Sequence, residues 1–175
     1  MFQPQTLKKV FLSLGSNLGN KEKYLKRALF YLEKIPFKIK KVSSIYRSAP
    51  WGFSSSKEFL NLCVLGETSL SPLSLLFEIK KIEALLGRKI YIQRKEYKDR
   101  KIDIDIILYE NLIFQTDILS IPHPLFHLRA FVMKPALEIA PSWIHPKFNL
   151  TLNELYEKFK HVLNLQEIHK YTTLK

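Results

Sequence analysis

The chain has 175 residues, of which 46% are hydrophobic and 13% aromatic, and its formal net charge is +12. This composition fits one globular domain with a sizeable core and excludes a disordered chain. The single cysteine, Cys63, excludes an internal disulfide framework and a zinc site built on cysteines. The positive charge indicates an anionic partner (a nucleic acid, a membrane surface or a nucleotide), or it reflects only a lysine-rich proteome.

The first nine residues contain no apolar run of the kind found in signal peptides. No later stretch is long enough to span a membrane. We therefore expect a soluble, cytoplasmic protein whose cysteine is reduced.

The first third of the chain is predicted to form a strand, a helix and a second strand. Residues 9–14 read as a buried strand, and a turn with two glycines leads to Asn20, a typical N-cap. Apolar residues at helical spacing predict a helix over 21–34, and a second strand follows over 37–46. The glycine turn could cradle a phosphate. It lacks the Gly-Lys-Ser/Thr ending of a P-loop, so a purely structural turn is the alternative.

A loop over 47–57 and the strand predicted over 59–68 carry candidate ligand-binding side chains. In the loop, Trp51 and Phe53 could stack on a planar ring, or they could pack onto the core. In the strand, Asn61 stands out because a buried amide must find hydrogen-bond partners. Those partners could be backbone groups or the edge of a heterocyclic ligand.

A second helix is predicted over 71–86, with Ser71 as its N-cap and Gly87 at its end. Residues 88–100 then form a basic segment without an apolar period. Such a charge run is usually a solvated surface. This one leads directly into a strand with two acidic residues, where its arginines could neutralise a triphosphate.

The strand predicted over 102–108 is the best candidate for a metal site. Side chains alternate in a strand, so Asp103 and Asp105 share one face while the isoleucines around them point into a core. Two adjacent carboxylates repel each other unless a cation is present. Mg²⁺ prefers oxygen ligands and often uses one or two carboxylates together with substrate phosphates. The alternative is a solvent-facing strand that happens to carry two acidic residues.

The last third of the chain places His123 in a rigid loop between two prolines, where it is either structural or functional. A helix is predicted over 128–139, and a short amphipathic helix with a polar tail follows from residue 150. The sequence shows no repeats, low-complexity tracts or linkers. Residues 1–175 are therefore predicted to be a single domain, with the tail from about 150 peripheral.

The element order β-α-β-β-α-β predicts an α+β, ferredoxin-like sandwich with an additional C-terminal strand and helices. The two helices of the repeat are expected to cover one face of an antiparallel sheet. This fold hosts many functions, including RNA-binding RRM domains. An RRM carries an aromatic signature on a central strand. Here the corresponding strand carries two aspartates, which would repel phosphate without a metal.

Several motifs occur in order along nearly the whole chain. The most specific is Arg-x-hydrophobic-Asp-hydrophobic-Asp-hydrophobic at 100–106, followed by Pro-His at 122–123. The others are Gly-Ser-Asn at 15–17, Arg-Ser-Ala-Pro-Trp-Gly at 47–52, Phe-Leu-Asn at 59–61, Ile-Glu at 82–83, Gly-Arg at 87–88 and Arg-Ala-Phe at 129–131. Together they resemble the 6-hydroxymethyl-7,8-dihydropterin pyrophosphokinase family of folate biosynthesis.

The resemblance implies transfer of the β,γ-pyrophosphate of ATP to the pterin's hydroxymethyl oxygen, with release of AMP. Asp103 and Asp105 match the pair that holds two Mg²⁺ ions, and Arg88 and Arg100 join them as catalytic residues. No separate general base is visible in the sequence, so the hydroxyl proton is lost either to Asp105 or because a metal lowers the hydroxyl pKa. The positions that match ATP or phosphate contacts are Glu83, Arg88, Arg94, Arg100, Ile106, His123 and Arg129. The positions that match the pterin pocket are Ser48, Ala49, Trp51, Phe59, Asn61, Asp103 and Phe131.

The chain also departs from the family pattern. Its basic segment is about two residues longer than in familiar bacterial members, and Arg94 is assigned as the second arginine of that segment. Tyr97 stands where a tryptophan is common, Pro124 where a tyrosine is common, and Lys80 where a glutamine is common. These changes affect ATP contacts and leave the metal and pterin positions intact.

The resemblance leads us to expect ATP and the pterin as small-molecule substrates, no nucleic acid, no membrane, and a monomer. The basic segment is expected to close over ATP. A magnesium-dependent nucleotide transferase of other specificity is the main alternative, and an RNA-binding module is a more distant one.

Overall fold

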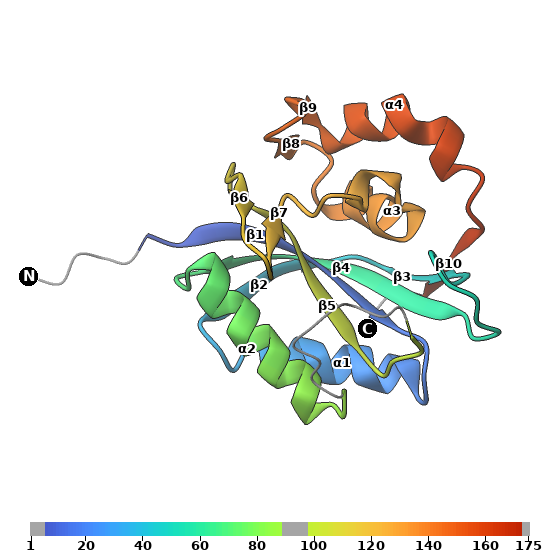
Figure 1. Cartoon of the computed structure of the whole chain (residues 1–175), viewed down its shortest axis with the longest axis horizontal. Helices are drawn as coiled ribbons and strands as arrows, with labels where there is room; N and C mark the ends of the chain where they lie inside the picture. The colour runs from blue at the N-terminus through green and yellow to red at the C-terminus, as the bar shows by residue number, and fades with distance from the viewer. Residues whose placement is uncertain (1–5, 89–97, 173–175) are drawn as a thin grey trace, which may run out of the picture.

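An antiparallel sheet of six strands forms the centre of the molecule (Figure 1). The computed structural model describes residues 6–88 and 98–172. The strands pair in the order β10-β3-β4-β1-β5, and β2 also pairs with β4. Their bounds are β1 Lys8–Ser16, β2 Phe37–Val42, β3 Ile45–Ser48, β4 Phe59–Thr68, β5 Asp103–Tyr109 and β10 Ile168–Thr172.

Helices cover both faces of this sheet (Figure 1). The helices α1 (Lys21–Leu32) and α2 (Pro72–Leu85) lie on one face and bury a first core there. The helices α3 (Ala130–Ile139) and α4 (Leu152–Leu163) lie on the other face and bury a second core. Short elements complete the chain: β6 Phe114–Gln115, β7 Ser120–Ile121, a 3₁₀ turn at Phe126–Leu128, β8 Ile144–His145 and β9 Leu150–Thr151.

The predicted α+β fold and its C-terminal additions are confirmed, although three strands rather than two lie between the first two helices. The predicted helix starts are correct because Asn20 accepts a hydrogen bond from the Lys23 amide, and Ser71 accepts one from the Ser74 amide. The additional strand lies in the tail, where β10 pairs with β3 and becomes an edge of the sheet.

The single strand predicted over 37–46 is wrong, because the chain forms two strands there, β2 and β3. The break falls at Ser43 and Ser44. The Ser43 hydroxyl accepts from the Cys63 amide at 2.9 Å, and the Ser44 amide donates to Glu138 Oε2 at 2.8 Å. These bonds to distant residues hold Ser43 and Ser44 outside the strand ladder, and β2 and β3 pair with different parts of β4.

The glycine turn predicted over 15–20 is shorter than expected, since Gly15 and Ser16 belong to β1. A β-bulge lies between β1 and β5, at Phe11 and Leu12. On β5, Ile107 and Leu108 consequently both join the second core, although they are consecutive. Among the described residues, no helix is long and apolar enough to cross a membrane.

Candidate active site

Three neighbouring strands bring the polar residues of the predicted site together. Because β1 pairs with both β4 and β5, its residues lie between theirs. Residues two apart on one strand point to the same face of the sheet. Paired residues on adjacent strands therefore line up in rows across the sheet. The two rows that matter are Asn61–Gly15–Asp103 and Cys63–Ser13–Asp105.

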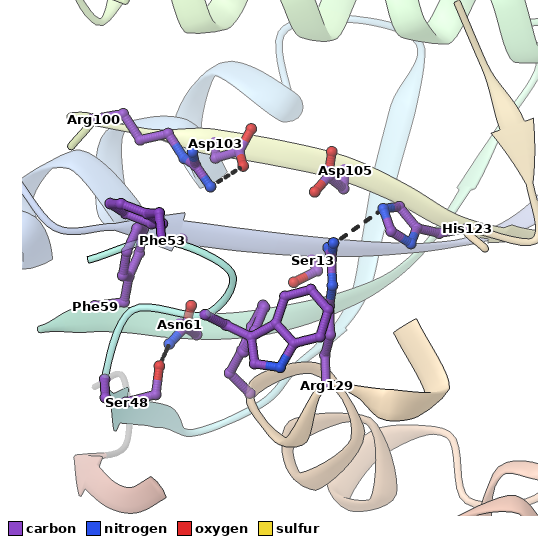
Figure 2. A pocket seen from close by; sticks show the side chains of 14 residues that line it. Ser13, Ser48, Phe53, Phe59, Asn61, Arg100, Asp103, Asp105, His123 and Arg129 are labelled. Carbon is purple, nitrogen blue, oxygen red and sulfur yellow. Dashed lines mark hydrogen bonds and ion pairs between the residues drawn. The ribbon is translucent and has the colours of Figure 1, made fainter. Parts of the chain in front are cut away.

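Helix α3 covers part of this face and leaves the rest accessible. The Cys63 thiol lies beneath the helix, 3.6 Å from the Val132 carbonyl oxygen. Beyond the start of α3, the sheet forms the floor of a pocket whose walls come from the loop after β3, the His123 loop and the first turn of α3 (Figure 2).

Most of the residues predicted for the pterin, the metal and the phosphates line this one pocket. These are Ser48, Ala49, Trp51, Phe59, Asn61, Arg100, Asp103, Asp105, His123, Arg129 and Phe131. In Figure 2, Arg100, Asp103, Phe53 and Phe59 gather at one end, whereas Asp105, Ser13, His123 and Arg129 gather at the other.

Ser13, Gly15 and Phe53 also line the pocket and were absent from the predicted site. Gly15 lets the floor pack closely, since a Cβ there would lie 3.0 Å from Asn61 Oδ1 and 3.5 Å from Phe59 Cδ1. Phe53 contacts Phe59 edge to face, with ring centroids 6.1 Å apart. The polarity of a loop with two aromatic residues was the signal for Phe53. Gly15 belongs to the Gly-Ser-Asn motif at 15–17, and no local signal marks Ser13.

Aromatic rings and one amide shape the pocket for a flat polar molecule. The guanidinium of Arg129 lies 4.6 Å from the ring centroid of Trp51 and 5.8 Å from that of Phe131. Asn61 is 2% exposed, and its amide donates to the Ser48 hydroxyl at 2.9 Å. That bond fixes the orientation of the Asn61 amide in the floor of the pocket.

The Asp103 carboxylate lies between two arginines. Arg88 Nη1 donates to its Oδ1, and Arg100 Nη2 pairs with its Oδ2 at 2.9 Å. The same Arg88 nitrogen lies 2.6 Å from Glu83 Oε1. Both arginines are largely buried, so their charges act in a weakly screened environment.

Glu83 lies outside the pocket and orients Arg88, which in turn contacts Asp103. It is 2% exposed, between α2 and β5, where its Oε1 accepts from the Ile104 amide at 2.8 Å. Lys80 pairs with its other oxygen at 2.8 Å. Burial, and then the Asp103 carboxylate, raises the pKa of Glu83 against the opposing effects of Lys80 and Arg88.

Three predicted ATP positions, Glu83, Arg88 and Ile106, do not line the pocket. The Ile106 side chain is 3% exposed within the first core, so only its backbone could face a ligand. Arg94 and Tyr97, together with the expected closure of the basic segment, lie outside the described residues.

His123 and Arg129 form the end of the pocket nearest Asp105. The His123 amide donates to the Ile107 carbonyl at 2.9 Å, which ties the loop to β5. Its Nδ1 accepts from the Leu125 amide at 3.3 Å. Arg129 Nη1 lies 3.4 Å from His123 Nε2 (Figure 2).

The donor set at the two aspartates suits Mg²⁺ bound together with phosphates. Asp103 and Asp105 supply hard carboxylate oxygens from one face of β5. Among the described residues, no group of three or more His, Cys, Asp or Glu side chains could enclose a metal. Any ion here would therefore need ligands from substrate and water, which is the usual situation of Mg²⁺ in nucleotide-dependent enzymes.

Comparison with known proteins finds related sequences and structures. Residues 11–141 match the family described as 7,8-dihydro-6-hydroxymethylpterin-pyrophosphokinase (HPPK). The chain is 42% identical over 145 residues to the 2-amino-4-hydroxy-6-hydroxymethyldihydropteridine pyrophosphokinase of Aquifex aeolicus, a match covering 83% of this chain and 88% of that protein. It is 39% identical over 149 residues to the folic acid synthesis protein of Pneumocystis carinii, covering 85% of this chain and 20% of that protein.

Among solved structures, a triple mutant of Plasmodium falciparum HPPK-DHPS has the same fold, with a TM-score of 0.76 and 19% sequence identity. The match covers 97% of this chain and 48% of that one. The chain thus spans most of the Aquifex protein and half or less of the two longer proteins.

Proposed function

Since this chain belongs to the 7,8-dihydro-6-hydroxymethylpterin-pyrophosphokinase family, we propose that the pocket beside Asp103 and Asp105 is its active site. The activity is transfer of pyrophosphate from ATP to 6-hydroxymethyl-7,8-dihydropterin, which yields the pterin pyrophosphate and AMP in folate biosynthesis. The observation that carries the assignment is that the two aspartates and the aromatic pocket occupy the same face of one sheet.

The pterin ring is assigned to the part of the pocket bordered by Phe59, Trp51 and Phe131. Phe59 and Phe131 offer ring faces for stacking, and Trp51 closes the wall. Asn61 is held by Ser48, so its amide is oriented to read the edge of the heterocycle. In this arrangement the hydroxymethyl group points toward Asp103 and Asp105.

The phosphates are assigned to the cationic side of the aspartate pair. Arg88 and Arg100 already lie against Asp103, and Arg129 lies beside His123. These side chains would bind the triphosphate and orient its β-phosphorus. The pterin hydroxyl oxygen then bonds to that phosphorus while the bond to the oxygen shared with the α-phosphorus breaks, and AMP leaves. Asp105 is the chain's candidate acceptor for the hydroxyl proton.

Asp103 and Asp105 are assigned as the protein ligands of Mg²⁺, and two ions are proposed. When bound, the metal would offset negative charge on the phosphates. When no metal is bound, the arginines around Asp103 limit the repulsion between the carboxylates of Asp103 and Asp105.

The decisive experiment incubates the protein with Mg²⁺, ATP and 6-hydroxymethyl-7,8-dihydropterin, and measures AMP and the pterin pyrophosphate. Equimolar formation of both is expected. The matched reaction without pterin should form no AMP above background. A magnesium-dependent transferase of other specificity would bind an ATP analogue equally well with and without the pterin and would form no pterin pyrophosphate.

We also propose that residues 1–175 act as a single domain and a monomer in the cytoplasm, with no nucleic acid or membrane as partner. Sedimentation should give one species near 20.6 kDa. A dimer mass that persists on dilution would contradict the monomer.

A further inference from the structure

Asp99 joins three segments that border the pocket, although it does not line the pocket itself. Its Oδ1 accepts hydrogen bonds from Ser55 Oγ at 2.7 Å and from Asn17 Nδ2 at 2.7 Å. Its Oδ2 pairs with Lys57 Nζ at 3.2 Å. Ser55 and Lys57 belong to the loop after β3, Asn17 follows β1, and Asp99 precedes β5.

Asn17 extends this junction through the backbone. It is 2% exposed, and its Oδ1 accepts from the Arg100 amide at 2.7 Å. The backbone amide of Asn17 in turn donates to the backbone carbonyl of Arg100 at 3.1 Å. The side chain of Asn17 also donates to the Lys57 carbonyl at 3.4 Å. The loop and the start of β5 are therefore both held against the end of β1.

The two arms of the junction meet at the same end of the pocket, on the Phe59 ring. Two residues before Ser55 comes Phe53, which packs edge to face on Phe59. Directly after Asp99 comes Arg100, whose guanidinium lies 5.4 Å from the Phe59 ring centroid and pairs with Asp103. Figure 2 shows Phe53, Phe59, Arg100 and Asp103 at one end of the pocket.

Asp99 holds the loop mainly through its hydrogen bond with Ser55, and its ion pair with Lys57 contributes less. Lys57 is half exposed, and an exposed ion pair contributes little. Hydrogen bonds to a carboxylate are stronger than those between neutral groups. The bond from Ser55 is the main cause that lowers the pKa of Asp99, so the carboxylate is ionised at neutral pH.

We propose that Asp99 is a positioning residue that sets the affinity for the pterin. It does so by holding the edge-to-face pair of Phe53 and Phe59 in a fixed position relative to Arg100 and Asp103. It acts through the loop and touches no reacting atom. This inference rests on the proposed function, because it names the part of that site that Asp99 controls.

The test compares Asp99→Ala, Ser55→Ala and the double variant for pterin affinity, the two KM values and kcat. Each single variant should raise the Kd and KM for the pterin by about tenfold, the range expected for losing a hydrogen bond to a charged group. The double variant should be no worse than Asp99→Ala, because both changes break the same link. The KM for ATP should stay within about twofold, since Asn17 still holds the Arg100 backbone.

Two further variants separate positioning from general stability. Asp99→Asn keeps an oxygen acceptor for Ser55 and Asn17 and should restore most of the pterin affinity. Glu157→Ala removes an exposed carboxylate paired with Lys160 on α4, far along the chain from this junction, and should change no kinetic parameter. Thermal unfolding of every variant completes the set.

Three outcomes would overturn the inference. One is pterin affinity in Asp99→Ala within twofold of the wild type. Another is additive effects in the double variant. The third is a common fall in thermal midpoint and in both substrate affinities, which would mark a purely structural role. A wild-type protein without activity would overturn the proposed function as well, whereas an active wild type with unaltered variants overturns this inference alone.

Discussion

The two aspartates of β5 have different surroundings although they share one face. Asp103 is 9% exposed and lies between Arg88 and Arg100, so its charge is balanced within the protein. Asp105 is only partly buried and lies across from Ser13, near the end of the pocket that holds His123 and Arg129. Asp103 is thus held in the fold by two ion pairs, and Asp105 is the more exposed of the two carboxylates.

Replacing Asp105 with alanine should therefore remove activity and leave the fold intact. We expect the rate of AMP formation to fall by roughly a hundredfold or more, because charge stabilisation through a metal ligand is worth several kcal/mol. The thermal midpoint should stay close to that of the wild type, since no core residue changes. The comparison variant is Asp117→Ala, an exposed carboxylate in the β6–β7 turn. A near-normal rate in Asp105→Ala would exclude the assigned metal role.

At the scale of elements, a single buried carboxylate joins α2 to β5. Glu83 accepts from the Ile104 amide and pairs with both Lys80 and Arg88. The helix thereby sets the position of an arginine that contacts Asp103, even though the helix does not reach the pocket.

Glu83→Ala should lower the free energy of unfolding by about 3 kcal/mol, because it leaves the buried Ile104 amide without its acceptor and removes one of the two carboxylates that pair with Arg88. Urea denaturation followed by circular dichroism measures this loss. The matched control on the same helix is Glu78→Ala, whose carboxylate pairs with Lys81 at the surface. Its cost should stay within about 0.5 kcal/mol. Equal stability of the two variants would contradict the structural role of Glu83.

A cluster of aromatic rings packs the 3₁₀ turn, the β8–β9 hairpin and α4 together. His145 stacks on Phe126, and His127 lies against Phe148 and Phe159. Burial, and then the neighbouring His127, lowers the pKa of His145 from 6.5 to about 4. Lys147 acts in the same direction, and burial lowers the pKa of His127 as well.

The packing of this aromatic cluster should weaken as the pH falls from about 6.5 to about 4. In that window the unfolded chain binds a proton at His145 and the folded chain does not, so the free energy of unfolding drops by up to about 1.4 kcal/mol per pH unit. His145→Asn keeps an acceptor for the Lys147 and Phe148 amides and cannot be protonated there. Its stability should fall less steeply than that of the wild type over this window. Parallel pH profiles would rule out His145 as the cause.

At the scale of the whole molecule, the C-terminal segment completes the second core and extends the sheet. Leu152, Leu155, Leu163 and Ile168 are buried against the face that α3 covers. Gln166 donates to the Leu128 carbonyl and accepts from the Ala130 amide, which holds the start of α3 beside the pocket. The segment beyond 150, set apart as peripheral in the sequence, thus contributes to the core and supports one wall of the site.

A chain that ends at residue 149 should lose most of its stability. Its four missing buried side chains contribute about 1.5–3 kcal/mol each, and the total approaches the stability of a typical domain. We expect no cooperative thermal transition at 37 °C or above for this variant, measured by circular dichroism. A chain ending at residue 172 is the control and should unfold like the full chain. A shortened chain with an unchanged midpoint would restore the peripheral interpretation.

Most of the elements and the chemical character of the site follow from local patterns in the sequence. Period-two alternation was enough to put Asp103 and Asp105 on one face, and the caps at Asn20 and Ser71 were enough to start two helices, because both signals are local. Only the tertiary structure decided that Gly15 and Ser13 lie beside those aspartates and that Asp99 joins the loop to β5. It also decided that the chain breaks at Ser43 and Ser44. The physical reason is that the register between strands and the contacts between distant loops depend on packing across the whole sheet, which no local pattern encodes.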